Sequence, residues 1–132
     1  MSVQMELHKI IISEMQPEQI IVLKEVDGER KFPIVIGSGE AWAIDRRLKG
    51  KPHPRPLTHD LLASVIEGLG GTIDRIEIND LQDHTFFARI LIRQNGSVVK
   101  IDSRPSDAIA LGVASMVPIF VAEHVLADVC RE

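Results

Sequence analysis

At 132 residues and 45% hydrophobic content, the chain has the size and composition of one globular domain, which we expect to span residues 1–132. The formal net charge of −4 disfavours a protein that holds long nucleic acid by bulk electrostatics. A single cysteine, Cys130, excludes an intramolecular disulfide, and no secretory leader pattern or membrane-spanning apolar run is present. The sequence therefore predicts a cytoplasmic protein without membrane contact.

Alternating apolar residues predict three strands near the N-terminus, at Val3–Ile12, Gln19–Val26 and Lys31–Ile36. The dipeptide Asp27-Gly28 between the second and third strands is typical of a hairpin turn. Pro33 lacks an N–H donor, which favours an edge position for the third strand. The three strands therefore form a meander.

Two helices are expected after this meander. The first covers Glu40–Leu48 and ends at Gly50. Thr58 is expected to cap the second helix, which Gly70-Gly71 closes. The apolar residues of this second helix fall on one face; they are Leu61, Leu62, Val65, Ile66 and Leu69.

The second half of the chain repeats this plan around an Asn95-Gly96 turn. We expect a strand with Ile73, Ile76 and Ile78 near its start, followed by two more strands at Phe86–Arg93 and Val98–Ile101. A helix at Ser103–Met116, a short strand at Pro118–Val121 and a terminal helix at Glu123–Val129 complete the chain. Shared strand-turn-helix order accounts for the repeat as well as duplication does. If the repeat is real, Glu40 and Asp107 occupy equivalent places.

These elements predict an α+β fold. Two halves, each a β-meander followed by a helix, would form a mixed, largely antiparallel sheet packed with helices. The edges of such a sheet must be covered, and pairing across a two-fold axis is a common solution, so we expect a homodimer.

Two predicted helix starts carry similar polar groups: Arg55-Pro56-Leu57-Thr58-His59-Asp60 and Asp102-Ser103-Arg104-Pro105-Ser106-Asp107. A helix N-terminus offers unsatisfied N–H groups and a partial positive charge, which suit a phosphate or another anion. Capping accounts for the hydroxyls and acids, whereas Arg55 and Arg104 are unfavourable there unless an acid or anion lies close. A functional cluster and a set of caps with structural ion pairs both stay open. A functional cluster would line one concave patch with Arg55, His59, Asp60, Asp102, Arg104 and Asp107.

Three sequence blocks resemble the bifunctional nuclease domain family: Gly37-Ser38-Gly39-Glu40-Ala41, the stretch from Arg55 to Leu62, and the stretch from Asp102 to Leu111. The resemblance covers nearly the whole chain. It implies an α+β domain that tends to dimerise and a nuclease that acts on both DNA and RNA with little sequence preference.

Hydrolysis of a phosphodiester needs a nucleophilic water, charge neutralisation on the phosphate and help for the leaving oxygen. The candidate catalytic residues are His59, Asp60, Asp102, Asp107 and Glu40. The candidate phosphate-binding residues are Arg55, Arg104, Thr58, Ser103 and Ser106.

Two catalytic routes are open. In one, Mg²⁺ or Mn²⁺ is held by carboxylates drawn from Glu40, Asp60, Asp102 and Asp107. In the other, His59 acts as general base or acid while Arg55 and Arg104 stabilise the phosphorane. The alternative function is a non-enzymatic interaction or regulatory module, or a domain that binds a small anion.

Basic residues cluster before the second helix, at Arg46, Arg47, Lys49, Lys51 and Arg55. They are interpreted as a solvated helix end and loop, with a phosphate-steering rim as the alternative. Trp42, the single tryptophan, is interpreted as a core or dimer-interface residue rather than a base-stacking one.

Overall fold

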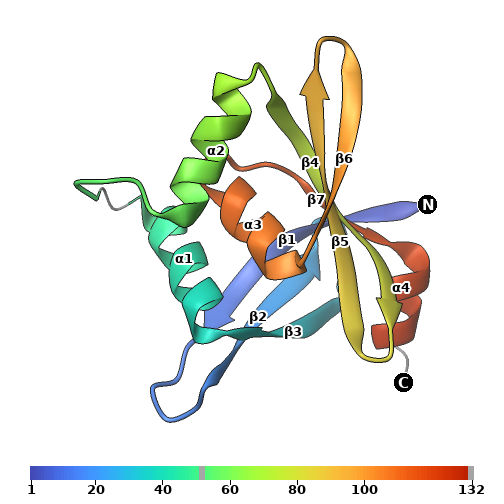
Figure 1. Cartoon of the computed structure of the whole chain (residues 1–132). Coiled ribbons are helices and arrows are strands. Elements are labelled where there is room, and N and C mark those ends of the chain that lie inside the picture. The colour runs from blue at the N-terminus through green and yellow to red at the C-terminus, as the bar shows by residue number, and fades with distance from the viewer. Residues whose placement is uncertain (51–52, 131–132) are drawn as a thin grey trace.

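The computed structural model describes residues 1–50 and 53–130. One seven-stranded sheet with the order β3-β2-β1-β7-β4-β5-β6 carries helices against it (Figure 1). The strands are β1 (Ser2–Ile11), β2 (Glu18–Glu25), β3 (Lys31–Gly37), β4 (Thr72–Gln82), β5 (Thr85–Gln94), β6 (Ser97–Ser103) and β7 (Ile119–Ala122). The helices are α1 (Ser38–Lys49), α2 (Thr58–Gly68), α3 (Pro105–Gly112) and α4 (Glu123–Val129), and a 3-10 turn, Val113–Ser115, follows α3.

The sheet consists of two antiparallel meanders joined by β7. Strands β1, β2 and β3 form the first meander, and β4, β5 and β6 form the second. Strand β7 pairs antiparallel with β1 and parallel with β4, so that Ile119 lies opposite both Met5 and Ile76. This arrangement confirms the predicted α+β fold of two meander-plus-helix halves in a mixed, largely antiparallel sheet.

The turn residues behave largely as their chemistry requires. Asn95 and Gly96 have φ values of 51° and 78°, the left-handed pair of a two-residue hairpin turn, and they join β5 to β6. Strand β3, which contains Pro33, is an edge strand as predicted. Gly50 ends α1 in the left-handed conformation, also as predicted.

The starts of two helices differ from the sequence prediction. Leu57, not Thr58, is the N-cap of α2, because the third helical residue, Asp60, accepts the Leu57 N–H at 3.1 Å. The helix predicted over 103–116 is shorter and begins at Pro105, whose missing N–H suits a first turn. Ser103 instead ends β6, where its hydroxyl donates to the carbonyl of Arg104 at 2.8 Å.

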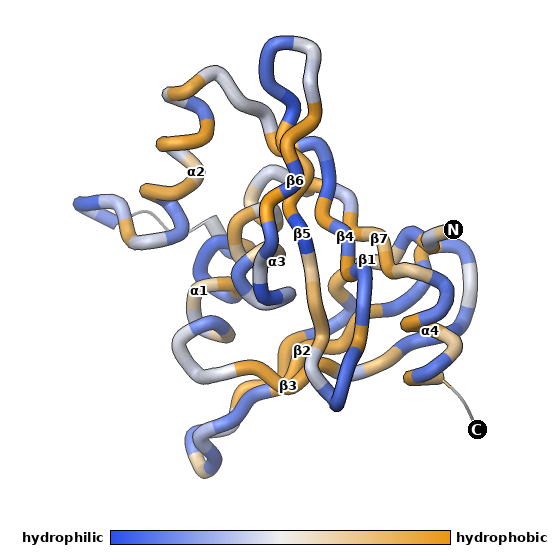
Figure 2. Tube along the Cα trace, turned by 45° about the vertical axis from the view of Figure 1, so that its right-hand side comes forward, coloured by the Kyte–Doolittle hydropathy of each residue, from blue (hydrophilic) through white to orange (hydrophobic). Residues whose placement is uncertain are grey.

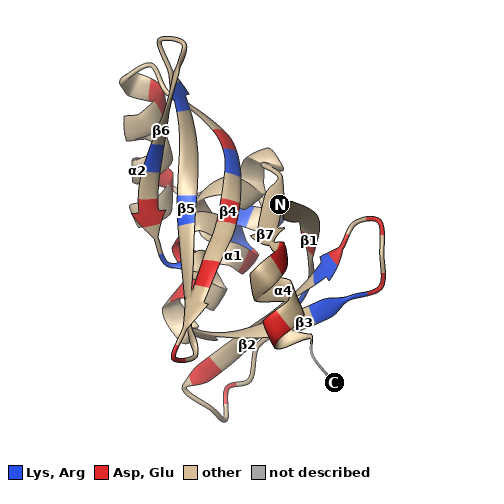
Figure 3. Ribbon diagram, turned by 90° about the vertical axis from the view of Figure 1, so that its right-hand side faces the viewer, with Lys and Arg blue, Asp and Glu red and all other residues tan. Residues whose placement is uncertain are grey.

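Helix α3 is the centre of the core. Seven of its residues, Pro105, Ser106 and 108–112, are buried, and α1 adds Ala41 and Ile44 to the same cluster. The second meander carries an ion-pair network on β4 and β5. The buried Glu77 carboxylate pairs with Arg75 at 2.8 Å and with Arg89 at 2.7 Å. Figure 3 shows these opposite charges side by side on β4 and β5.

Helix α2 packs differently from the others. None of its residues, all of which the structure describes, is buried, although its apolar face is as predicted. Leu69 is 70% exposed, and Leu61 and Val65 are exposed as well. Figure 2 shows this helix as an apolar segment that stands away from the sheet. Only Ala63 and Ile66 pack partly buried against the core, so burial contributes less to holding α2 than to holding α3.

Polar contacts from Arg47 hold α2 instead. The Arg47 side chain is 9% exposed and lies between α1, α2 and α3. Its Nε donates to the carbonyl of Ala110 at 2.6 Å, its Nη2 donates to the carbonyl of Leu111 at 3.0 Å, and its Nη1 pairs with Asp60. One guanidinium thus satisfies carbonyls near the end of α3 and fixes the start of α2.

We expect Arg47→Ala to lower the free energy of unfolding by about 3 kcal/mol, because buried carbonyls and a partly buried carboxylate lose their partner. Urea denaturation measures this change. Exposed Arg55 is the control, and Arg55→Ala is expected to shift stability by less than about 0.5 kcal/mol. Equal effects of the two substitutions would contradict the role of Arg47.

The same contact predicts a pH dependence. Burial raises the pKa of Asp60, but the Leu57 N–H, the Arg47 hydrogen bond and the charges of Arg46 and Arg47 outweigh it and hold that pKa below its ordinary value. The stabilisation is therefore complete above the ordinary aspartate pKa and is lost as the pH falls through the lower folded-state pKa. We expect Asp60→Asn to lose less stability between pH 7 and acid pH than the wild type does.

Candidate functional site

Three acids occupy the same position in three helices. Glu40 in α1, Asp60 in α2 and Asp107 in α3 are each the third helical residue. Negative charge is favourable there because the first backbone N–H groups of a helix lack internal partners. Glu40 and Asp107 each follow the third strand of a meander, so they occupy equivalent places in the two halves.

Two of these acids cap their own helices. Glu40 Oε1 accepts the N–H of Gly37 at 3.1 Å, as Asp60 does from Leu57. A Cβ on Gly37 would lie 2.6 Å from Glu40 Oε1, so a side chain at position 37 would displace the Glu40 carboxylate from this position. Capping therefore explains part of the acid content of both helix starts.

Asp107 is committed to side chains. Its Oδ1 accepts from Nε2 of His59 at 3.1 Å, and its Oδ2 accepts from Nε of Arg104 at 2.8 Å. Nη1 of Arg104 in turn lies 3.6 Å from Oε1 of Glu40. The result is a continuous polar chain from α2 through α3 to α1.

The ionisation of Asp107 follows from these contacts. Burial raises the pKa of the Asp107 carboxyl. The hydrogen bonds and charges of Arg104 and His59 lower this pKa by more than burial raises it, so it lies below its ordinary value. The hydrogen bond to Asp107 and the charge of Asp107 in turn raise the pKa of Arg104. At neutral pH, Asp107 is a carboxylate that accepts from the His59 imidazole and orients the ring.

A pocket of about 560 Å³ lies where the three helix starts meet. The sequence-predicted residues that line it are Glu40, Thr58, His59, Asp102, Ser103, Arg104 and Asp107. Its apolar wall consists of Leu62, Ile90 and Ile101. The His59 side chain is 16% exposed, whereas that of Arg104 is 64% exposed and accessible to a ligand.

Three sequence-predicted residues lie elsewhere. Asp60 points to Arg46 and Arg47. Arg55 is exposed in the connection before α2 and does not line the pocket. Ser106 is buried and faces a separate pocket of about 330 Å³, shared with Glu40 and Arg104. The shared patch therefore contains His59, Asp102, Arg104 and Asp107 but neither Arg55 nor Asp60.

A metal centre built from protein side chains needs several carboxylate, imidazole or thiolate ligands close together. Within residues 1–50 and 53–130, no group of three or more His, Cys, Asp or Glu side chains is placed to hold an ion. Asp60 is paired with two arginines, and the Arg104 guanidinium contacts both Glu40 and Asp107. Protein side chains alone therefore do not form a metal centre here.

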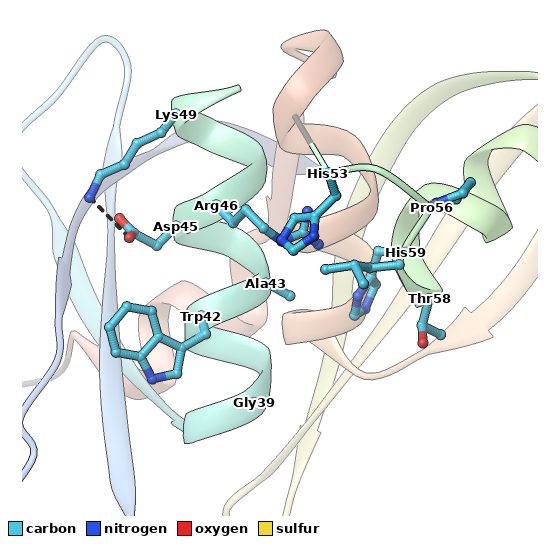
Figure 4. A pocket seen from close by; sticks show the side chains of 11 residues that line it. Gly39, Trp42, Ala43, Asp45, Arg46, Lys49, His53, Pro56, Thr58 and His59 are labelled. Atoms are coloured by element: carbon cyan, nitrogen blue, oxygen red, sulfur yellow. Dashed lines mark ion pairs between the residues drawn. The ribbon is translucent and has the colours of Figure 1, made fainter. Parts of the chain in front are cut away.

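A second pocket, of about 700 Å³, adjoins the first and shares Gly39, Thr58 and His59 with it (Figure 4). Trp42 lines it and is 55% exposed, so Trp42 is not a core residue. Sequence analysis missed this pocket because its residues are scattered over α1 and the connection to α2. Of the basic run, Arg46 and Lys49 line it, Arg47 is buried, and Lys51 lies outside the described residues.

The fold and this site define a known class. Residues 21–131 match the bifunctional nuclease domain, and the chain belongs to this family. An uncharacterized protein of Mycobacterium tuberculosis is 41% identical over 119 residues, which cover 90% of this chain and 71% of that relative. Bifunctional nuclease 1 and Bifunctional nuclease 2 of Oryza sativa subsp. japonica are 24% and 27% identical, covering 86% and 83% of this chain but 36% and 35% of the rice proteins. Among the described residues, no helix is long and apolar enough to cross a membrane.

The geometry makes a direct prediction about Asp107. Arg104→Gln removes a hydrogen bond and a positive charge that lower the Asp107 pKa, so this pKa should rise. Titration of the side-chain carboxyl by ¹³C NMR measures it. Arg55→Gln is the matched control, expected to leave the Asp107 titration unchanged. An Asp107 pKa that is insensitive to Arg104 would show that the pair does not persist in solution.

Proposed function

We propose that the chain is a nuclease that hydrolyses DNA and RNA phosphodiester bonds with little sequence preference. The observation that carries the proposal is the hydrogen bond between His59 and ionised Asp107, beside the exposed guanidinium of Arg104. Membership of the bifunctional nuclease domain family and the nuclease names of the rice relatives support the substrate class.

His59 is the proposed general base. An ionised Asp107 can only accept, so the hydrogen bond places a proton on Nε2 of His59 and leaves Nδ1 as the basic nitrogen. Nδ1 takes a proton from a water as the water oxygen bonds to phosphorus. The bond from phosphorus to the leaving oxygen then breaks, and the imidazolium returns the proton to that oxygen. Water is the nucleophile because DNA has no 2′-hydroxyl.

Arg104 is the proposed phosphate-binding residue. Negative charge builds on the phosphate oxygens as water attacks, and a guanidinium presents several N–H donors in a planar fork to them. Asp107 holds Nε of this group in place at 2.8 Å. Asp107 therefore orients both the base and the phosphate ligand without contacting the reacting atoms itself.

Catalysis by Mg²⁺ or Mn²⁺ is the competing route. These ions commonly bind one or two carboxylates together with substrate phosphates. Glu40, Asp102 and Asp107 are the carboxylates that line the pocket and could hold such an ion with the substrate. The ion would neutralise charge on the phosphate. The His59 route is the one proposed here because the His59–Asp107 hydrogen bond already orients the imidazole.

We expect His59→Ala to lower the rate of cleavage of DNA and RNA by at least about 100-fold, the usual contribution of a general base. Loss of Asp107 in Asp107→Asn should also abolish cleavage in either route. Exposed His8 in β1 supplies the control, and His8→Ala should cleave as the wild type does.

Purification and chelation complete this test. All variants are purified identically, since contaminating nucleases would give equal activity in every sample. A chelator should leave the His59 route intact, whereas loss of activity that Mg²⁺ or Mn²⁺ restores would establish the metal route. A pure, folded wild type that cleaves neither DNA nor RNA would favour the non-enzymatic interaction module, in which the same residues act as caps and ion pairs.

We also propose that the protein is a homodimer joined through β6. Strand β6 is an edge of the sheet, and its Val98, Val99 and Ile101 side chains are exposed. Antiparallel pairing of two β6 strands about Ile101 would set Lys100 of each copy opposite Asp102 of the other. The edge is thus complementary in charge to itself.

Light scattering should give twice the protomer mass of 14.7 kDa at micromolar concentration. Lys100→Glu sets like charges opposite each other at two symmetric places and should weaken dimerisation about tenfold. The double variant Lys100→Glu with Asp102→Lys reverses the pair and should restore the dimer. A monomeric wild type, or a double variant no better than the single one, would contradict this interface.

A further inference from the structure

The pocket next to the His59 pocket has an unusual set of lining residues. Its residues come from α1, from His53 and residues 56–57, and from the start of α2, and they include the only tryptophan of the chain (Figure 4). Trp42 is 55% exposed, and Trp is a residue that normally buries much of its ring. A large aromatic surface is therefore presented to solvent inside a pocket of about 700 Å³, a volume in the range of ligand sites.

Two cationic side chains and a histidine line the same pocket as Trp42. Arg46, Lys49 and His53 line the pocket together with one acid, Asp45. Lys49 pairs with Asp45 at 3.0 Å on the helix surface, where such a pair is worth little and readily exchanges for another anion. Arg46 contacts Asp60 at 3.4 Å, and its guanidinium has further N–H donors for a phosphate.

The two pockets adjoin each other. Gly39, Thr58 and His59 line both, so His59 stands at their boundary. An extended ligand that passes this boundary would meet Arg104 and Asp107 on one side and Trp42 with Arg46 on the other. His59, the candidate base, is thus common to the linings of both pockets.

We propose that the Trp42 pocket binds an unpaired nucleotide of single-stranded DNA or RNA, with the base stacked on the Trp42 indole and the adjoining phosphate held by Arg46 and Lys49. The placement of the scissile phosphate at His59 rests on the nuclease function proposed above. Stacking on an aromatic ring accepts every base, because each base has a π-face, and this accounts for little sequence preference.

The overall charge argues for the same ligand. A net charge of −4 disfavours binding of nucleic acid by bulk attraction, so a contribution from stacking is needed more here than in a basic protein. The bases of a duplex are stacked on one another and do not offer a free face to Trp42. A single strand is thus favoured over a duplex.

Tryptophan fluorescence tests this site directly, because Trp42 is the only tryptophan of the chain. The probe is a short oligothymidylate with phosphorothioate linkages that resist hydrolysis. We expect it to quench the Trp42 emission, whereas an abasic oligomer with the same backbone should not. A duplex of the same length should quench less than the single strand.

Binding of the end-labelled oligothymidylate, followed by fluorescence anisotropy, measures the contribution of the ring. Trp42→Ala should weaken binding about tenfold, and Trp42→Phe should recover part of the loss. Leu48, which is exposed on the same helix but does not line the pocket, supplies the control Leu48→Ala, expected to bind as the wild type does. One phosphate held by Arg46 and Lys49 and a second held by Arg104 together predict a slope of log affinity against log salt concentration of about −1.4.

The outcomes separate this inference from the nuclease proposal. An oligothymidylate that the wild type cleaves in its ordinary phosphodiester form, but that neither quenches Trp42 nor binds less well to Trp42→Ala, would overturn the stacking site and leave the nuclease. Quenching and tenfold weaker binding to Trp42→Ala by a protein that cleaves nothing would support the site and overturn the nuclease. Equal quenching by the abasic oligomer or by the duplex would overturn the base-stacking role.

Discussion

The buried guanidinium of Arg47 is the contact on which the arrangement of the site depends. It bonds to the carbonyls of Ala110 and Leu111 in α3 and pairs with Asp60 in α2. Because no α2 side chain is fully buried and only Ala63 and Ile66 pack partly against the core, these polar contacts help to fix where the helix begins. His59, one residue before Asp60, is thereby held within 3.1 Å of Asp107. The candidate base is positioned by an ion pair that lies outside the pocket.

The same backbone device serves two purposes in this fold. Each of α1, α2 and α3 has an acid as its third residue, where the free N–H groups of a helix attract negative charge. In α1 and α2 the acid caps its helix, while Asp107 in α3 accepts from His59 and Arg104. The structural interpretation therefore holds for the two capping acids, whereas the functional interpretation of Asp107 with His59 and Arg104 stays a prediction.

Much of the fold could be predicted from local patterns. Alternating apolar residues and the Asn95-Gly96 turn indicate the second meander because strand pairing there depends on neighbours in sequence. The orientation of Asp60 could not be predicted, since its partner Arg47 belongs to a run of basic residues that look alike in sequence. The exposure of Trp42 was equally hidden, because a helical sequence does not show which of its apolar positions lack a packing partner.

Strand β7 has a consequence for how the domain assembles. It stands between β1 and β4, so residues near position 119 must reach Met5 before the two meanders share one sheet. Hairpins within each meander close short loops, whereas the β1–β7 pairing closes a loop that spans most of the chain and costs more conformational entropy. During synthesis the two halves can each form local structure early. They can join in one sheet only after β7 has been made, which makes closure of the sheet a late step of folding.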